Sequence, residues 1–202
     1  DAPQVQALRH LPPFLARPHL PLVSNLTGPM LCVGMMRPGD KLASYTLVTQ
    51  ALAALPASTD WRMDIAGDGP AREEVAKMMA PFGDRVRLHG LLDADALAGL
   101  YAQASLLVWP GVNEAFGINY LEAQAAGIPV VAQDRPGVRD VVFAPMCRVD
   151  EGPTAIAKAI EHLISDPVAR RNIGTRARTR IGTHHLLGAA TETLLDTIEG
   201  LS

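Results

Sequence analysis

The feature that most constrains the fold is a regular alternation of short apolar runs with longer helix-like segments between residues 30 and 149. Apolar runs typical of buried strands occur at 30–34, 61–67, 86–90, 105–109, 129–133 and 147–149. Segments that predict helices lie between them, at 42–55, 71–81, 93–103, 117–126 and 138–142. Asp93 or Asp95 is a plausible cap for the third of these helices. Strands that alternate with helices form βαβ units with right-handed crossovers. The sequence therefore predicts an α/β fold: a doubly wound, Rossmann-like parallel sheet of about six strands with helices on both faces.

The two ends of the chain depart from this alternation. Residues 1–29 are rich in proline and show no clean period, so we expect an extended lead-in before a single domain at residues 30–202. After residue 153 the pattern is helical. Helices are expected at 154–165, after an Asp166 cap with Pro167 in the first position, and at 187–199.

Composition and charge exclude several classes of protein. With 202 residues, 48% of them hydrophobic, the chain can bury one sizeable core. A net charge of −3 argues against a nucleic-acid partner. No stretch approaches the ~20 apolar residues of a membrane span, and the start of the chain lacks a signal-peptide pattern. Cys32 and Cys147 have no metal-ligand spacing and fit reduced, buried cysteines, so we expect a cytoplasmic protein without a bound metal.

Residues 109–132 combine a strand end, a loop, a helix and the next strand. The strand stops at Pro110, and an apolar-periodic helix follows that ends at Gly127. Such units bind ligands at the carboxyl end of the strand, where the free amides of the helix start attract anions. Glu114 in the loop and Glu122 in the helix would repel a phosphate but accept hydrogen bonds from vicinal hydroxyls. A ligand with both parts is a nucleotide sugar.

This segment resembles the Glu-x7-Glu motif of retaining glycosyltransferases of family 4 with a GT-B fold, the glycosyl transferases group 1. The resemblance rests on Glu114-Ala-Phe-Gly-Ile-Asn-Tyr-Leu-Glu122-Ala and the following Ala-Gly-Ile-Pro-Val-Val-Ala, and it covers about residues 30–200. It implies that Glu114, Phe116, Gly117 and Ile118 contact the donor hexose and diphosphate, with Glu114 as the catalytic residue. It also implies that Glu122 binds the ribose. For an isolated pair of glutamates, a solvated loop residue and a helix-face residue would be the simpler interpretation.

The loop after the first strand, Gly34-Met-Met-Arg-Pro-Gly-Asp-Lys41, presents Arg37 and Lys41. Its Gly-x4-Gly spacing invites a P-loop interpretation, but an Asp precedes Lys41 and no Ser or Thr follows it, so we reject that interpretation. Two cations here would neutralise a diphosphate as the glycosidic bond breaks. The family usually carries Gly-Arg after this strand, whereas here Met35 occupies the Arg position. This departure weakens the assignment of Arg37 more than that of Lys41, and a solvated loop charge is the alternative for both.

Two further loops are expected near the nucleotide. Gly67-Asp-Gly-Pro70 closes the second strand and resembles the family's Gly-Asp-Gly-Pro. We expect it to shape a helix start near the nucleotide, and we favour this structural role over a direct contact with the nucleotide. His89-Gly-Leu-Leu92 ends the third strand, and in similar proteins the backbone near Leu92 meets the base. A backbone contact leaves little trace in the sequence, so the base stays unassigned.

Three other features are assigned structural roles. The arginines at 170, 171, 176, 178 and 180 are expected to form a solvated helix face, with a peripheral contact with anionic lipid at the inner membrane face as the lesser alternative. His184-His185 has no carboxylate or cysteine at ligand spacing, which argues against a metal site. Tyr120 is expected to pack in the core.

Two classes of function remain open. The first is the donor-binding domain of a retaining hexosyltransferase, with a nucleotide-sugar donor, a saccharide or lipid-linked acceptor, and no cofactor or metal. Its acceptor-binding N-terminal domain would lie outside this chain, because Leu11-Pro-Pro-Phe14 resembles the phrase that connects the two halves, and the isolated domain would be inactive. The second is a nucleotide-binding GT-B-like module without transfer activity. Half of a sugar-nucleotide epimerase is less favoured, because Glu114 with Phe116-Gly117 offers sugar positioning.

Overall fold

The computed structural model describes residues 10–200, so the first nine residues of the expected lead-in and the last two residues lie outside the described part. It contains one parallel sheet of five strands. The strands are β1 (Met30–Val33), β2 (Met63–Ala66), β3 (Val86–Gly90), β4 (Leu107–Val108) and β5 (Val130–Val131). Their order is β3-β2-β1-β4-β5. The chain builds outward from β1 to β3 and then returns to place β4 on the other side of β1, so the doubly wound α/β fold is confirmed.

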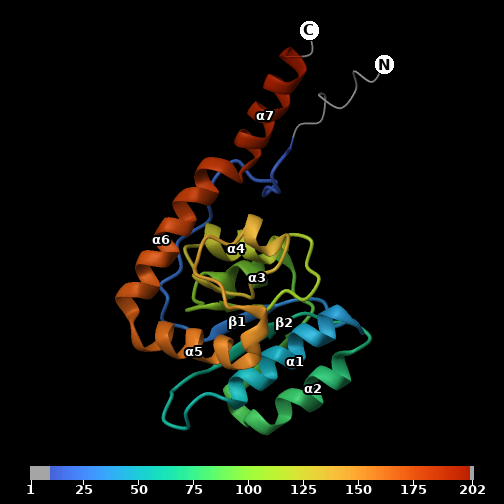
Figure 1. Ribbon diagram of the computed structural model, residues 1–202, viewed down its shortest axis with the longest axis vertical. Coiled ribbons are helices and arrows are strands. Elements are labelled where there is room, and N and C mark those ends of the chain that lie inside the picture. Colours follow the sequence, from blue (N-terminus) through green and yellow to red (C-terminus); the bar gives the residue numbers. More distant parts are fainter. Residues whose placement is uncertain (1–9, 201–202) are drawn as a thin grey trace.

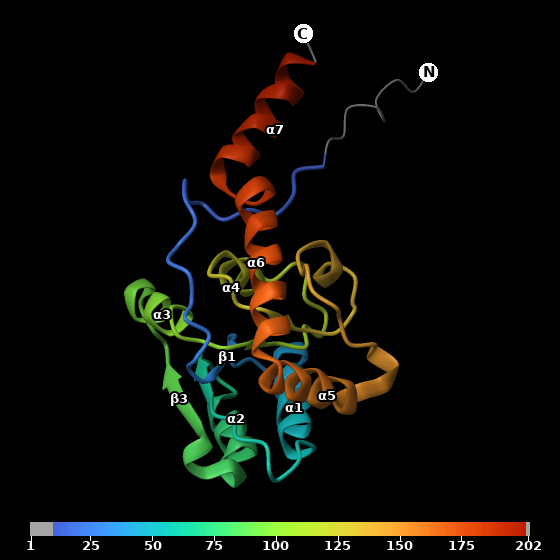
Figure 2. The ribbon, with the colours of Figure 1, turned by 90° about the vertical axis from the view of Figure 1, so that its left-hand side faces the viewer.

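Helices cover both faces of the sheet (Figure 1). On one face lie α3 (Ala94–Tyr101) and α4 (Ile118–Ala125), and on the other lie α1 (Asp40–Ala53), α2 (Arg72–Met79) and α5 (Gly152–Ser165). Short 3-10 helices are η2 (Ala80–Arg85), η3 (Val138–Asp140) and η4 (Val149–Glu151). The long helix α6 (Pro167–His184) packs along α4, and α7 (Leu187–Glu199) then projects away from the sheet (Figure 2).

The strands are short apolar runs because both faces of the sheet are buried. Met30, Leu31 and Cys32 of β1 are each at most 1% exposed, and Leu107 of β4 is fully buried. Trp109, directly after β4, is also fully buried and meets Tyr45 of α1 edge to face, with ring centroids 5.2 Å apart. The core therefore reaches to the carboxyl edge of the sheet, where the ends of the strands are held rigidly.

The expected sixth strand at residues 147–149 is reduced to an isolated bridge between Cys147 and Gln133. Cys147 N–H donates to Ala132 and its carbonyl accepts from Asp134, which continues the sheet for one residue. Val149 is 42% exposed and already begins η4. The strand stops here because its outward residues find no apolar cover at the edge of the sheet.

The described part of the lead-in, residues 10–29, packs on the domain. Residues 10–29 contain no helix, and Leu15 forms a bridge with Leu186 at the junction of α6 and α7. At that junction, His185 is 4% exposed and its Nδ1 donates to the carbonyl of Pro13 at 2.7 Å. Further along, the hydroxyl of Ser24 donates to Ala104 at 2.8 Å. His185 therefore has a packing role at the contact between the lead-in and the junction of α6 and α7.

Local signals placed the helix starts well. Asp93 accepts from Ala96 N–H at 2.8 Å and caps α3, and Asp166 accepts from the N–H groups of Val168 and Ala169 to cap α6. The expected Asp166 cap is confirmed, and of the two candidates at 93 and 95 the structure uses Asp93. The helix expected at 138–142 is a single 3-10 turn, η3.

The expected solvated arginine face on α6 is only partly present. Three arginines, at 171, 176 and 180, are exposed, whereas Arg170 and Arg178 are half-buried. Arg178 donates to the carbonyl of Ala125 at the end of α4. The helices approach closely, because a side chain on Gly174 of α6 would lie 2.0 Å from the carbonyl oxygen of Gly127. The prediction was wrong for these two arginines because Arg178 packs against the end of α4 and Arg170 packs against the end of α5.

Among the described helices, none combines the length and apolar character needed to cross a bilayer.

Candidate functional site

A cavity of about 420 Å³ opens at the carboxyl edge of the sheet. The ends of β1 and β2, the loop after β3, the loop after β4 and the start of α4 contribute to its wall. In this topology β1 and β4 are neighbours whose crossovers run in opposite directions, which leaves a crevice between their ends. The cavity therefore lies where an open α/β sheet binds its ligand.

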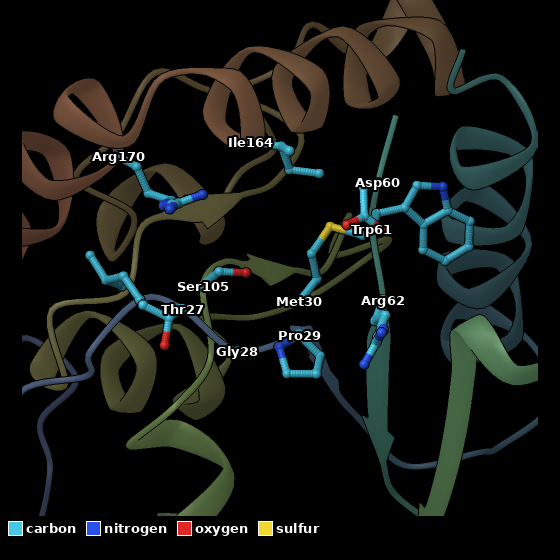
Figure 3. Close-up of a pocket in the computed structure, with 11 residues that line it drawn as sticks. Thr27, Gly28, Pro29, Met30, Asp60, Trp61, Arg62, Ser105, Ile164 and Arg170 are labelled. Carbon is cyan, nitrogen blue, oxygen red and sulfur yellow. The ribbon is translucent and has the colours of Figure 1, made fainter. Parts of the chain in front are cut away.

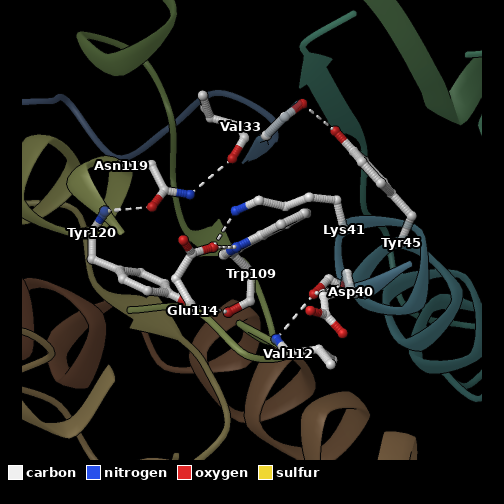
Figure 4. Close-up of polar contacts among 11 residues, drawn as sticks. Val33, Asp40, Lys41, Tyr45, Trp109, Val112, Glu114, Asn119 and Tyr120 are labelled. Carbon is white, nitrogen blue, oxygen red and sulfur yellow. Dashed lines mark hydrogen bonds and ion pairs between the residues drawn. The ribbon is translucent and has the colours of Figure 1, made fainter. Parts of the chain in front are cut away.

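Glu114 and Lys41 form an ion pair on the cavity wall (Figure 4). Oε2 of Glu114 accepts from Nζ of Lys41 at 2.5 Å and from Nε1 of Trp109 at 3.1 Å. The two charged side chains are 15% and 20% exposed, respectively. Nζ also lies 5.5 Å from the centroid of the Trp109 ring. Because the indole is fixed in the core, it orients the carboxylate, which in turn orients the lysine.

The loop that carries Glu114 is held by α1. The N–H of Val112 donates to the hydroxyl of Ser44 at 3.0 Å (Figure 4). Nδ2 of Asn113 donates to Asp40 at 2.9 Å. Three separate contacts, including the ion pair, therefore connect this loop to the first two turns of α1.

Asn119 joins the start of α4 to the end of β1. Its Nδ2 donates to the carbonyl of Val33 at 2.8 Å and its Oδ1 accepts from the N–H of Tyr120 at 3.0 Å. Gly117, with φ of 60°, precedes the helix, and a side chain there would lie 2.7 Å from the Tyr120 ring. The first N–H groups of a helix lack intrahelical partners. At Gly117 and Ile118 this helix start forms part of the cavity wall.

Tyr120 is a core residue, as expected. It is fully buried, and its hydroxyl donates to the carbonyl of Trp109 at 3.0 Å. Asn119 was missed by the sequence reasoning. The only signal for it was an asparagine in the first turn of a helix, where the type commonly satisfies backbone groups.

Glu122 lies further along α4 on the same cavity wall. Its Oε2 accepts from the hydroxyl of Tyr101 at 3.0 Å. Burial raises the pKa of the Glu122 carboxyl above its ordinary value, and the hydrogen bond from Tyr101 and the charge of Arg17 oppose the rise. Burial also raises the pKa of Tyr101, and the neighbouring Glu122 charge adds to it. Tyr101 therefore stays a neutral donor that fixes the carboxylate.

The loops after β1 and β2 interlock. The N–H of Met36 donates to the carbonyl of Asp68 at 2.9 Å, and the carbonyl of Met36 accepts from Ala71 at 2.9 Å. Gly67 has φ of 154°, and a side chain there would lie 1.9 Å from the carbonyl oxygen of Gly34. These contacts fit the structural role expected for this loop, and Gly67 and Asp68 also line the cavity.

A family model described as glycosyl transferases group 1 matches residues 29–166, which is more than half of the 202 residues. The chain belongs to this family. The fold agrees, because a solved sucrose-phosphate synthase from Thermosynechococcus elongatus matches 96% of this chain and 52% of that one with a TM-score of 0.80 at 22% identity. The predicted GT-B type of Rossmann-like fold is therefore confirmed.

Two relatives show how far the similarity extends. A GDP-mannose-dependent alpha-(1-6)-phosphatidylinositol dimannoside mannosyltransferase of Mycobacterium tuberculosis is 35% identical over 136 residues, which cover 66% of this chain and 35% of the relative. An exopolysaccharide phosphotransferase of Streptomyces coelicolor is 32% identical over 189 residues, which cover 87% of this chain and 19% of the relative. The chain thus spans about a third or less of these relatives.

In this member of the family, the cavity brings together most of the residues chosen from the sequence. Those in its wall are Lys41, Leu92, Glu114, Gly117, Ile118 and Glu122. Arg37 and Phe116 are not among the lining residues. Met36 is 1% exposed and turns inward, Met35 lines the cavity, and Arg37 is exposed. The phosphate role of Arg37 stays a prediction that the geometry does not favour.

Within residues 10–200, no group of three or more histidine, cysteine, aspartate or glutamate side chains is arranged to hold a metal ion. Cys32 and Cys147 are free and buried, as expected. Burial raises the pKa of the Cys147 thiol to about 11 and that of Cys32 further. Both are therefore uncharged packing residues.

Proposed function

We propose that this domain binds the nucleoside-diphosphate-sugar donor of a retaining glycosyltransferase that transfers a hexosyl group to a saccharide or lipid-linked acceptor. The observation that carries the proposal is one cavity whose wall combines an oriented lysine, a helix start and two half-buried carboxylates. A diphosphate needs the first two groups, and sugar hydroxyls need the carboxylates. The mannosyltransferase relative, whose name states that it is GDP-mannose-dependent, supports this class of substrate.

The geometry supports a division of roles along the cavity. Lys41 and the N–H groups at the start of α4 would hold the diphosphate, and Glu114 would contact the donor sugar beside them. Glu122 lies four residues beyond Ile118, about 6 Å further along the helix axis, where the ribose would extend. Leu91, Leu92 and Met35 form an apolar part of the wall that suits the face of a base.

Lys41 and Glu114 would act as a unit during transfer. In this structure the two charges neutralise each other at 2.5 Å. When a donor binds, the diphosphate would compete for Lys41 and a sugar hydroxyl would donate to Glu114, so both groups would exchange one partner for another. As the glycosidic bond breaks, negative charge grows on the departing diphosphate, and a positioned lysine stabilises that charge most in the transition state. No metal is required in this scheme.

The acceptor would be held by a second domain outside this chain. The short coverage of both relatives supports this part of the proposal. Because the cavity is open at the carboxyl edge of the sheet, a facing domain would exclude water and position the acceptor. The isolated domain should then bind donor without turnover.

A second candidate function is a nucleotide-binding module without transfer activity. The exopolysaccharide phosphotransferase relative matches more of this chain than the mannosyltransferase does, and its name states a reaction other than glycosyl transfer. The similarity alone therefore does not require transfer of a sugar. The presence of Met35 where the family usually carries arginine also removes one cation from the cavity.

Calorimetric titration tests the binding proposal. The domain is titrated with UDP, GDP and ADP, each with and without EDTA, and then with the sugar conjugate of the best nucleotide. Binding of at least one nucleotide that survives EDTA supports a metal-free donor site, and strict magnesium dependence for every nucleotide contradicts it. A second assay measures sugar transfer and donor hydrolysis by the longest natural polypeptide that contains this domain. Activity that is lost in Glu114→Gln supports the enzyme, and absence of activity supports the nucleotide-binding module.

A further inference from the structure

A second cavity, of about 400 Å³, lies at the opposite edge of the sheet (Figure 3). Met30 begins β1, Arg62 directly precedes β2, and Ser105 leads into β4, so its wall is built at the amino ends of three strands. The cavity lined by Lys41, Glu114 and Glu122, which we propose binds the donor, is called the donor cavity below. Since the strands are parallel, it lies at their other ends. The two cavities share no lining residue.

One side of this cavity carries an unusual cation. Nε of Arg170 is buried and has no hydrogen-bond partner, and it is the only such side-chain atom among residues 10–200. Nη1 donates to the carbonyl of Leu163 at 3.2 Å, so part of the guanidinium is anchored. Burial lowers the pKa of Arg170, and the positive charge of Arg171 adds to the effect. A half-buried guanidinium with one buried N–H group that lacks a partner is unfavourable, and an anion beside it would offset that cost.

The neighbouring groups face the same space. Figure 3 shows the guanidinium of Arg170 and the hydroxyl of Ser105 directed into the cavity from one side, with Asp60 and Arg62 across from them beside Trp61. Ser105 is 8% exposed. Within the described residues, no ion pair involves Arg62, Arg170 or Asp60.

We propose that this second cavity binds the phosphate monoester of a small polyol. Arg170 and Ser105 would hold the phosphate, because guanidinium and hydroxyl groups donate to its oxygens. Asp60 would accept from hydroxyls of the polyol, and Arg62 would donate to its oxygens at the other side of the cavity. The volume lies within the range of small-molecule sites. A ligand of this kind would bridge the half-buried Arg170 and the buried Ser105 on one side of the cavity and the exposed Asp60 on the other.

The test is a calorimetric titration of the chain with glucose 6-phosphate, inorganic phosphate and glucose. We expect glucose 6-phosphate to bind more tightly than phosphate, and glucose not to bind. Arg170→Gln should weaken the binding of glucose 6-phosphate at least about tenfold, because it removes a charged hydrogen-bond donor. Arg176→Gln is the matched control: this arginine lies on the same helix, is exposed and lies outside the cavity, so the variant should bind glucose 6-phosphate unchanged.

Two further variants keep the proposal open to refutation. Arg62 is exposed, so Arg62→Gln should fold even if Arg170→Gln does not. This variant should also weaken the binding of glucose 6-phosphate. Lys41→Ala should leave this binding unchanged, because Lys41 lines only the donor cavity. Loss of binding in Lys41→Ala, with retention in the Arg62 and Arg170 variants, would assign the phosphate to the donor cavity and overturn the proposal. Absence of binding by both phosphates would also overturn it.

Discussion

Replacing Glu122 by glutamine separates the cost of a buried charge from its use in binding. The carboxylate accepts from Tyr101 at 3.0 Å, and burial raises its pKa. A glutamine carbonyl accepts the same hydrogen bond and has nearly the same shape, but it carries no charge. The variant should therefore keep the fold while it loses the charge assistance that we propose for the ribose hydroxyls.

The expected loss of affinity follows from the type of hydrogen bond. A bond to a charged group contributes about 1.5–3 kcal/mol and a neutral one about 0.5–1.5 kcal/mol, so each ribose hydroxyl loses about 1 kcal/mol. Two hydroxyls give about 2 kcal/mol, or roughly 30-fold weaker binding of a nucleoside diphosphate. In the unmodified protein, affinity should also fall as the pH falls through the raised pKa of Glu122, because protonation removes the charge. The variant should lack this dependence.

Stability should change in the opposite direction. Because the pKa of Glu122 is higher in the folded than in the unfolded protein, its contribution to stability is fully present below its ordinary value of 4.5 and is lost as the pH rises through the folded-state pKa. Above that range Glu122→Gln should be as stable as the unmodified domain, or more so. The exposed Glu192→Gln on α7 provides the control.

Titration calorimetry from pH 5 to 8 and urea denaturation over the same range measure both effects. Affinity of Glu122→Gln within twofold of the unmodified protein would refute the ribose assignment. A variant that is markedly less stable at pH 8 would refute the reasoning from the buried charge.

Three further outcomes are expected. Lys41→Ala should weaken the binding of a nucleoside diphosphate at least about tenfold. Glu114→Gln releases Lys41 from its ion pair, so it should leave the affinity for the nucleoside diphosphate unchanged or raised and should weaken the binding of the nucleotide sugar. Calorimetry checks both variants, and equal losses of affinity for the nucleoside diphosphate would contradict the assigned roles. Gly67→Ala should lower the free energy of unfolding in urea by about 1–3 kcal/mol or more. At φ of 154° the new methyl group would lie 1.9 Å from a carbonyl oxygen. Gly99→Ala is the control, because nothing lies within 4 Å of its new methyl group, and it should not destabilise the domain. Asp166→Ala removes the two cap hydrogen bonds of α6 and should cost about 0.5–2 kcal/mol in the same assay, so an unchanged midpoint would show that packing alone sets this helix start.

Features that depend only on residues close to one another along the chain were predictable from the sequence. The alternation of apolar runs and helical segments determined the parallel α/β fold, because the period of a strand or helix is visible in any window of its own residues. The caps at Asp93 and Asp166 were predictable for the same reason, since a cap needs only the next three residues. The position of Glu114 and Glu122 at a strand end and on the following helix also placed both near one crevice.

The tertiary structure alone decided how distant residues meet. Lys41 and Glu114 are 73 positions apart, and their pairing depends on the packing of α1 beside the loop after β4. Arg178 and Arg170 looked like surface charges because nothing local shows that α6 crosses α4 and closes a cavity at the amino edge of the sheet. Local patterns determine which elements form, whereas the facing of a side chain depends on which elements pack against it, and those are brought together only by the folded chain.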